Sequence, residues 1–371
     1  MEQHYKEHHA YAYWLTTRQG IGYQKRRYLL QHYGTVQEIY EANLRELETV
    51  PLFRTKDLLQ LQNKPGPERL LEDLEQLWQR GIRFCWQGED CYPERLRHIE
   101  EPPFTLFYRG HLPREDRPIV AIVGGRNASY EGREIARNFG RQLAENGIQI
   151  VSGLARGIDI AAQRGTLELP GGQTYAVLGT GIDQCYPRQH IEEYIQMQNK
   201  GGVLSEYAPG TYGHPGNFAK RNRIISGLAD GVLVIEARKG SGSLITASCA
   251  LEQGKEIFVV PGSIVNRSYE GGNELLKSGG MVVTNARDVM DGLGIFVDTD
   301  LSAQKKKNKV MLETAEKIVY AMLGFDGIHI SEIVAKTGLA VPKVMEIVLS
   351  LENKGLIADV GQHHYALKLK D

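Results

Sequence analysis

The sequence IVAIVGGR at residues 119–126 joins five apolar residues directly to two glycines and an arginine. An apolar run of this kind, then a loop with glycine, then an amphipathic segment, recurs between residues 118 and 284. The other runs are Ile148–Val151, Thr174–Leu178, Val203–Leu204, Val232–Ile235 and Ile257–Val260. Near-continuous apolar strands that alternate with helices are typical of a parallel sheet covered on both faces. With right-handed crossovers they predict a doubly wound, Rossmann-like α/β sheet.

A small helical domain is expected before the sheet, over residues 1–90, of the SAM or helix-hairpin-helix type. Four leucines recur there at helical spacing, at Leu70, Leu71, Leu74 and Leu77. Gly20-Ile21-Gly22 ahead of a helix resembles half of a helix-hairpin-helix, whose backbone amides can contact a phosphate. No glycine stands near Val50–Phe53, where the second turn belongs. A packing module without DNA contact is therefore the favoured alternative.

We assign the sheet domain to residues 91–291 and expect a second small domain after it. A linker at residues 292–309 contains Lys305–Lys307 and separates the sheet from residues 310–371. That last segment resembles a winged helix, with a β-turn at Gly361 after helices predicted at Glu316–Leu323, Ser331–Thr337 and Val341–Lys354. It contains six lysines and no arginine against eight acidic residues, a balance that gains little from counterion release on DNA. We therefore expect it to bind a protein, or no partner, rather than DNA.

Charge and composition exclude several classes of protein. The 44 Lys and Arg residues stand against 45 Asp and Glu residues, so the chain as a whole is not strongly basic, which leaves room for a local basic patch. No apolar run approaches the roughly 18 residues of a membrane span, and we expect a soluble, cytoplasmic protein with no membrane partner. The four cysteines form no CxxC pair and the histidines lack metal-ligand spacing, so neither a disulfide nor a metal site is predicted.

The loops after the strands carry the candidate binding residues. Ligands of doubly wound sheets lie at the carboxyl ends of the strands, where glycines admit a phosphate and arginine or lysine supplies charge. Phosphate sites repeated along one sheet edge suit a polymer better than a mononucleotide. The candidates for DNA contact are Gly124, Gly125, Arg126, Gly153, Arg156, Gly157, Lys220, Arg221, Asn222, Arg223, Lys239, Ser241, Gly242 and Ser243. Phe218, expected on a loop beside these cations, is a candidate base-stacking platform, with a core position as the alternative.

Structural roles compete with ligand contact at several of these positions. Asp159 and Asp183 are more simply explained as helix caps than as ligand contacts. Ion pairing is the alternative for Arg126 and Arg156, and a structural hydrogen bond is the alternative for Glu236. The motifs G-x-G-x-x-G, G-x-S-x-G and Walker A are all absent from the sequence. No catalytic residue and no cofactor is therefore predicted.

At these loops the sequence resembles the DNA-processing protein A family (DprA, also called Smf), over about residues 92–288. The motifs that carry the resemblance are VSGLARGID (151–159), VLG (177–179), YP (186–187), LSE (204–206), RNRIISGL (221–228), SGSLIT (241–246), VPG (260–262) and GGN (271–273). The family usually has Gly-Ser-Arg where this chain has Gly124-Gly125-Arg126, and histidine where Gln163 stands. Because the first departure keeps the backbone amides and the arginine, we expect phosphate binding to survive it.

The resemblance implies single-stranded DNA binding without catalysis. Proteins of this family protect incoming DNA during natural transformation, load the RecA recombinase onto it and usually form homodimers, so the same partners are expected here. Two other classes stay open: a nucleotide N-glycosidase of the lysine-decarboxylase-like (LOG) group, and a module that senses a free nucleotide. The glycosidases carry Pro-Gly-Gly-x-Gly-Thr, whereas Pro170-Gly171-Gly172 is followed here by Gln173-Thr174 and precedes a strand.

Overall fold

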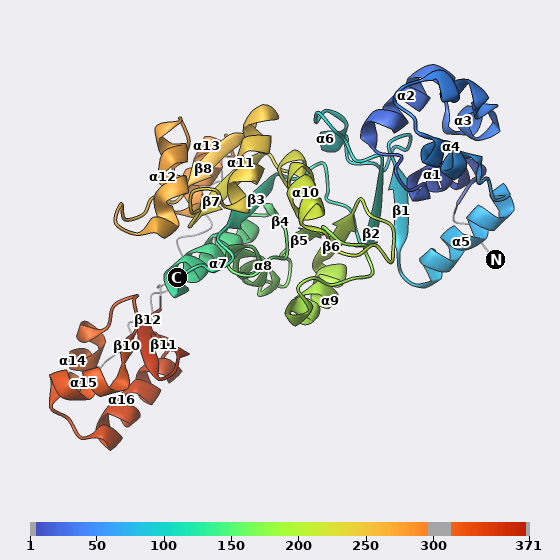
Figure 1. Cartoon of the computed structure of the whole chain (residues 1–371). Coiled ribbons are helices and arrows are strands. Elements are labelled where there is room, and N and C mark those ends of the chain that lie inside the picture. The colour runs from blue at the N-terminus through green and yellow to red at the C-terminus, as the bar shows by residue number, and fades with distance from the viewer. Residues whose placement is uncertain (1–4, 296–312, 369–371) are drawn as a thin grey trace.

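The computed structural model describes residues 5–295 and 313–368, whose elements are labelled in Figure 1. The first part is helical, as predicted, and comprises α1 (Glu7–Thr17), α2 (Tyr23–Tyr33), α3 (Val36–Glu41), a 3-10 turn (Leu44–Thr49), α4 (Thr55–Gln62) and α5 (Pro67–Gln79). Each segment contributes buried apolar side chains to one core, among them Trp14, Leu29, Ile39, Leu47, Leu61 and Leu74. Helix α2 ends at Gly34, whose φ of 92° suits glycine. Helix α5 begins at Pro67, where a missing N–H costs no hydrogen bond.

A nine-stranded sheet forms the centre of the molecule. Its strands are β1 (Arg83–Trp86), β2 (Thr105–Gly110), β3 (Ile119–Gly124), β4 (Gln149–Ser152), β5 (Thr174–Val177), β6 (Gly201–Ser205), β7 (Gly231–Ile235), β8 (Glu256–Val259) and β9 (Met281–Val282). They lie in the order β1-β2-β6-β5-β4-β3-β7-β8-β9, with β1, β2 and β6 paired antiparallel and β6 through β9 parallel. The chain runs outward from β3 to β6, returns beside β3 at β7 and runs outward the other way. The predicted doubly wound, Rossmann-like fold class is confirmed.

Helices cover both faces of the sheet, as the continuous apolar strands require. Val120 and Ile122 of β3 pack on one face against α7 (Tyr130–Glu145), α8 (Ile158–Leu167) and α13 (Ala286–Gly292). Ala121 and Val123 point to the other face, toward α10 (Pro215–Leu228) and α11 (Gly242–Glu252). The remaining helical segments of this part are α6 (Glu94–Arg97), α9 (Ile191–Lys200), α12 (Glu270–Lys277) and the 3-10 turns Arg188–His190 and Arg267–Tyr269.

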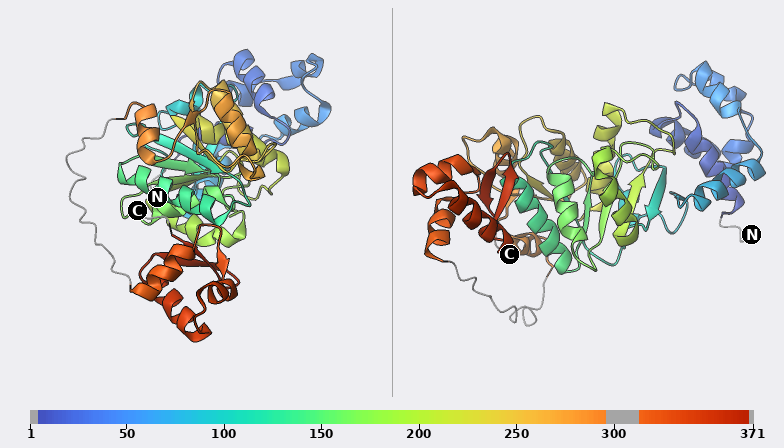
Figure 2. Two further views of the ribbon diagram at one scale, coloured as in Figure 1. Left: turned by 90° about the vertical axis from the view of Figure 1, so that its left-hand side faces the viewer. Right: turned by 90° about the horizontal axis from the view of Figure 1, so that it is seen from below.

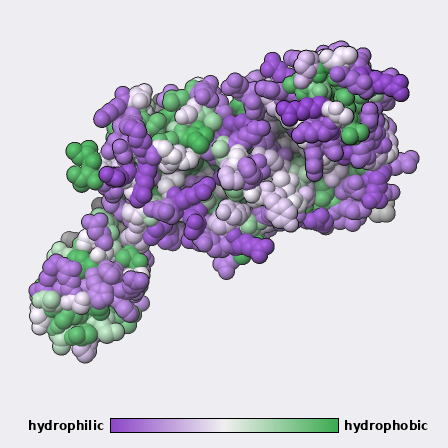
Figure 3. Space-filling model, viewed as in Figure 1, coloured by the Kyte–Doolittle hydropathy of each residue, from purple (hydrophilic) through white to green (hydrophobic). Residues whose placement is uncertain are grey.

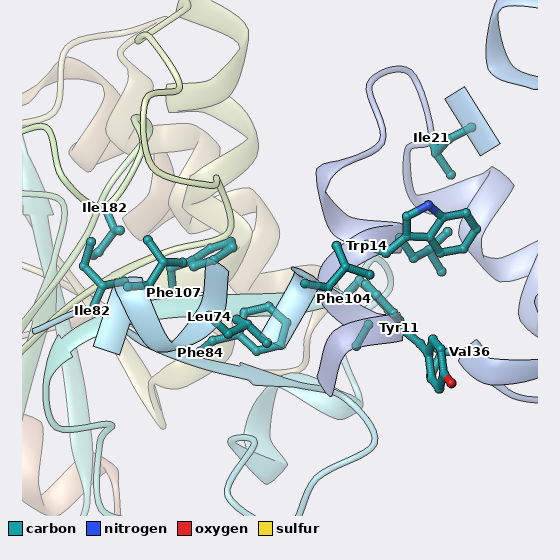
Figure 4. Close-up of a cluster of buried hydrophobic side chains, with 14 of the residues drawn as sticks. Tyr11, Trp14, Ile21, Val36, Leu74, Ile82, Phe84, Phe104, Phe107 and Ile182 are labelled. Carbon is teal, nitrogen blue, oxygen red and sulfur yellow. The ribbon is translucent and has the colours of Figure 1, made fainter. Parts of the chain in front are cut away.

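The helical part and the sheet share a core at β1 and β2. Strand β1 lies inside the range 1–90 that the sequence assigns to the helical domain, and four residues without alternation give no signal of a strand. The ring of Phe84 lies 5.8 Å from that of Tyr13 on α1. It also lies 5.3 Å from the ring of Phe107 on β2, and both of these phenylalanines are labelled in Figure 4. We propose that the boundary between the two domains precedes Arg83 and does not fall at residue 90.

The C-terminal part has the predicted winged-helix order, which is confirmed. It comprises α14 (Thr314–Met322), β10 (Ile328–His329), α15 (Ile330–Thr337), α16 (Val341–Asn353), β11 (Ile357–Gly361) and β12 (His364–Leu367), with strand order β10-β12-β11. Gln362 and His363, with φ of 53° and 58°, form the turn after Gly361. Figure 2 shows this part and the N-terminal helices on opposite sides of the sheet. The predicted Lys305–Lys307 linker lies outside the described residues.

None of the helices in residues 5–295 and 313–368 combines the length and the apolar character needed to cross a bilayer.

Candidate nucleic-acid interface

A cleft of about 410 Å³ lies where the strand order reverses, at the carboxyl ends of β3 and β7. The loop after β3, the first turns of α10 and the loop after β7 line this sheet-edge cleft. Doubly wound sheets bind their ligands at such a reversal. The predicted site residues that line it are Gly124, Gly125, Arg126, Phe218, Arg221, Asn222, Ser241, Gly242 and Ser243.

Glycines allow the loops of the cleft to pack directly against one another. A Cβ at Gly124 would lie 1.9 Å from the carbonyl oxygen of Ile235, and one at Gly157 would lie 2.0 Å from that of Gly125. Gly157 also has a φ of 81°, and the N–H of Ile158 donates to the Gly125 carbonyl at 3.3 Å. These glycines therefore serve loop packing, a role that the sequence pattern alone does not separate from phosphate contact.

Arg126 is an exposed cation at the mouth of the cleft. It forms no hydrogen bond or ion pair with any residue that the structure describes, so the ion-pair alternative has no support at this position. Arg156 is also exposed; it lies in the same loop as Gly153, between β4 and α8, and does not line the cleft. Arg126 thus keeps all of its donors for an anionic ligand.

Arg221 forms part of the floor of the cleft and is only 4% exposed. Its Nη1 donates to the carbonyl oxygen of Val177, and a Cβ at Gly153 would lie 2.1 Å from the same nitrogen. Burial lowers the pKa of Arg221 to about 10, an effect that the Asp159 carboxylate opposes and the nearby Arg126 charge increases. Arg221 stays charged at neutral pH and has a structural role that the sequence does not indicate.

Asp159 is the buried partner of this charge. Its carboxylate accepts a hydrogen bond of 3.1 Å from the N–H of Gly153, which precedes α8, so it ties the loop and is not bonded to the helix amides as a cap. Burial raises the pKa of Asp159, and the charge of Arg221 opposes that rise. No direct hydrogen bond joins Asp159 to Arg221, but the two opposite charges are buried close enough to stabilise each other, so loss of either would leave the other charge buried without compensation.

The cluster at residues 218–223 lies on helix α10, and the predicted loop at Phe218 is wrong. His214 caps this helix by accepting from the N–H of Gly216 at 3.1 Å, and Pro215 starts it. Phe218 is half-buried, and its ring centre lies 5.1 Å from that of Tyr186. The helical period then splits the cluster, because Phe218 and Arg221 face the sheet-edge cleft while Lys220 and Arg223 face away from it.

The loop after β7 contributes hydrogen-bond donors to the cleft. Ser241 and Ser243 are linked through their hydroxyls at 2.7 Å, and Asn222 donates to the carbonyl of Gly242 at 3.0 Å. Lys239 pairs with Glu274 at 2.9 Å and does not line the cleft, whereas its neighbour Arg238 does. The sequence signal for Arg238 is its place in the same loop.

Glu236 has a structural role. The sequence leaves open whether this residue is structural or catalytic. It is 3% exposed, and its carboxylate accepts from the backbone N–H of Ser129 at 2.8 Å and from the Ser129 hydroxyl. Ser129 is the N-cap of α7, so Glu236 fixes the start of that helix beside the cleft.

A second, larger groove of about 1210 Å³ lies between the N-terminal helices and the sheet. Lys220 and Arg223 line it from α10, and helices α1, α2 and α5 form the opposite wall. Its cations come from segments far apart in the sequence, which no local motif brings together. The cationic residues of the groove are Arg18, Arg26, Arg27, Arg80, Lys220 and Arg223.

Two family models match the sequence. The model of the DNA recombination-mediator protein A matches residues 83–294, and that of the DprA winged helix domain matches residues 303–362. Among curated relatives, the DNA processing protein DprA of Streptococcus pneumoniae is 44% identical over 204 residues, which cover 54% of this chain and 71% of that protein. Protein Smf of Escherichia coli is 37% identical over 284 residues, covering 75% and 76%.

Solved structures agree with this assignment. DNA processing protein A from Streptococcus pneumoniae matches with a TM-score of 0.66 at 32% identity, covering 77% of this chain and 98% of that one. DNA processing protein A from Helicobacter pylori, described for its single-stranded DNA binding mode, matches with a TM-score of 0.52 at 30% identity, covering 57% and 95%.

Proposed function

The chain belongs to the family of the DNA recombination-mediator protein A, and we propose on this basis that it binds single-stranded DNA along the carboxyl edge of its sheet. The observation that carries the proposal is the sheet-edge cleft, where Arg126 presents unpaired donors and Phe218 a half-buried ring at the reversal of strand order. Cations that follow a backbone and aromatic rings that stack on bases are the usual means of holding single strands. The Helicobacter pylori relative, described as binding single-stranded DNA, supports the same assignment.

The first test is the salt dependence of binding, measured by fluorescence anisotropy with a labelled oligothymidylate and a duplex of equal length. The affinity for the single strand should fall linearly against salt on logarithmic axes, with a slope of about −0.7 per phosphate neutralised. Arg126→Ala should weaken binding by about 1–3 kcal/mol, the loss of a charge-assisted hydrogen bond, without a change in melting temperature.

The matched control is Lys277→Ala, which removes an exposed cation of α12 that lines neither the cleft nor the groove. It should leave the affinity unchanged. Equal affinity for duplex and single strand, or a salt-independent affinity, would contradict the proposal.

Phe218 is proposed as the base-stacking residue of the cleft. Phe218→Ala should weaken single-strand binding by roughly 1–3 kcal/mol per stacked base and leave the salt slope unchanged, because no charge is removed. Phe218→Tyr keeps the ring and should retain the affinity. Melting and binding are measured on both variants. Since the ring also packs beside Tyr186 and against Gly179, some loss of stability is expected for the alanine variant. A destabilised variant with normal affinity would show that Phe218 serves packing alone.

We further propose that this binding protects incoming DNA during natural transformation and delivers it to the RecA recombinase, in the cytoplasm and as a homodimer. The support for these partners is membership of the family. Light scattering tests the dimer, and the rate of RecA assembly on coated single strands tests the delivery. A monomer, or a chain that only slows RecA, would overturn the corresponding part.

We also propose that the chain catalyses no reaction on nucleotides. Both acids that line the cleft have structural partners and are almost fully buried: Glu236 accepts from Ser129, and Asp159 accepts from Gly153. A nucleotide-turnover assay with free nucleotides separates this proposal from the N-glycosidase and nucleotide-sensor alternatives. Base release would favour the enzyme, and tight binding of a mononucleotide without turnover would favour the sensor.

A further inference from the structure

The larger groove lies between two parts of the molecule that share one hydrophobic core. The N-terminal helices are fixed to the sheet by the shared core and by a 3.2 Å hydrogen bond from the Thr16 hydroxyl to that of Thr105 on β2. The groove therefore exists without a movement of either part. Figure 3 shows hydrophilic side chains, interrupted by smaller hydrophobic patches, over the N-terminal helices and over the sheet domain.

The groove is strongly cationic although the chain as a whole is neutral. Six arginine or lysine side chains line it against two acids, Asp73 and Glu206. Arg27 of α2 and Lys220 of α10 are exposed and have no hydrogen bond or ion pair with the rest of the described chain. A cleft of one sign attracts ligands of the other, so the groove suits an anion.

Unsatisfied donors gather at one wall, around Glu206. Arg223 donates to this carboxylate at 2.6 Å, but its Nε and Nη1 are buried without a partner in the described structure, and so is the Nε of Arg26. Burial lowers the pKa of Arg26 to about 10, so it remains charged at neutral pH, and Glu206 opposes the shift. Two guanidinium groups beside one carboxylate leave a net positive charge at this wall, although one oxygen of Glu206 is also buried without a partner in the described structure. This charge attracts an anion through the field in the groove, and the direct contacts fall to the exposed Arg27 and Lys220.

The opposite wall adds backbone donors and an aromatic rim. Gly22 and Tyr23, at the start of α2, line the groove, and a Cβ at Gly22 would meet nothing within 4 Å. No side chain caps this helix, so its first amides have no side-chain acceptor in the described structure. Tyr212 stands at the rim with 83% of its surface exposed.

We propose that this groove binds the phosphodiester backbone of the part of a single strand that continues out of the sheet-edge cleft. The first turns of α10 separate the two cavities, with Phe218 and Arg221 on one side and Lys220 and Arg223 on the other. A chain of phosphates can therefore cross α10 and meet cations on both sides, whereas a free nucleotide fills only one cavity. The inference rests on the proposed function and extends it to a second contact surface.

The test compares two lengths of oligothymidylate, one of about 5 and one of about 25 nucleotides, the short one near the lower end of known site sizes. Arg27→Glu should lower the affinity for the long strand by about tenfold, as for a lost charged hydrogen bond, and reduce its salt slope by about 0.7. The affinity for the short strand should not change. Arg27→Lys should retain binding of the long strand.

The matched control is Arg45→Glu, which reverses an exposed charge on the same helical domain outside the groove. Tyr212→Ala should weaken only the long strand and keep the salt slope. Equal effects of Arg27→Glu and Arg45→Glu would overturn the groove inference while Arg126→Ala still tests the sheet-edge cleft. An unmodified chain that binds neither length would overturn the proposed function itself, and the groove inference with it.

Discussion

Arg221→Ala is expected to lower the free energy of unfolding by about 3–5 kcal/mol, the cost of leaving a buried charge without its compensating charge. The change removes the donor to Val177 and leaves the Asp159 carboxylate, 6% exposed, without its opposing charge. For a domain of this size the melting temperature should fall by roughly 6–20 °C. Thermal unfolding followed by circular dichroism measures the shift.

Two further variants identify the cause. Arg126→Ala removes the neighbouring exposed arginine and should leave the melting temperature unchanged. The double change Asp159→Asn with Arg221→Met removes both charges and should recover a large part of the lost stability, because the cost lies in the unpaired charge. If the Arg221→Ala variant has the same melting temperature as the unmodified protein, the two buried charges contribute nothing to the stability of the fold.

Gly157→Ala is expected to damage stability and DNA binding together. A residue with a side chain at φ 81° costs about 1–3 kcal/mol of backbone strain. The new methyl group would also lie 2.0 Å from the carbonyl oxygen of Gly125, a backbone atom that cannot rotate away, which adds roughly 1–3 kcal/mol of overpacking. Because Gly125 precedes Arg126, the relaxation should move the cation of the cleft and weaken single-strand binding.

The control is Gly147→Ala, at the end of α7. Gly147 has a similar φ of 77°, but a Cβ there meets nothing within 4 Å. It should cost the backbone strain alone and leave DNA affinity intact. Equal losses in the two variants, by thermal melting and anisotropy, would show that contact between the two glycine loops is unimportant.

The sequence predicts the sheet and the edge at which the proposed site lies, because apolar strand runs and glycine loops are local signals. Gly124-Gly125-Arg126 and Ser241-Gly242-Ser243 come together at the cleft because all carboxyl ends of parallel strands meet at one edge. Strand β1 could not be predicted from the sequence, because its four residues form a strand only by pairing with β2.

The roles of single side chains depend on distant partners and could not be predicted. Lys239 pairs with Glu274, 35 residues away in the sequence, so its charge is not available to a ligand in the cleft. The burial of Arg221 depends on Asp159 and Val177, and the groove around Arg26 needs the docked helices of another domain. Periodicity places a residue on a helix or strand, but its charge partners are set by tertiary packing.

The core shared by the N-terminal helices and the outer strands β1 and β2 has a kinetic consequence. Because the rings of Tyr13, Phe84 and Phe107 join the two parts, the cavity between them is preorganised. No entropy is then spent on closing one part over the other when a ligand arrives. Capture should be a single bimolecular step whose rate is set by diffusion and long-range attraction, and affinity should be tuned through the lifetime of the complex.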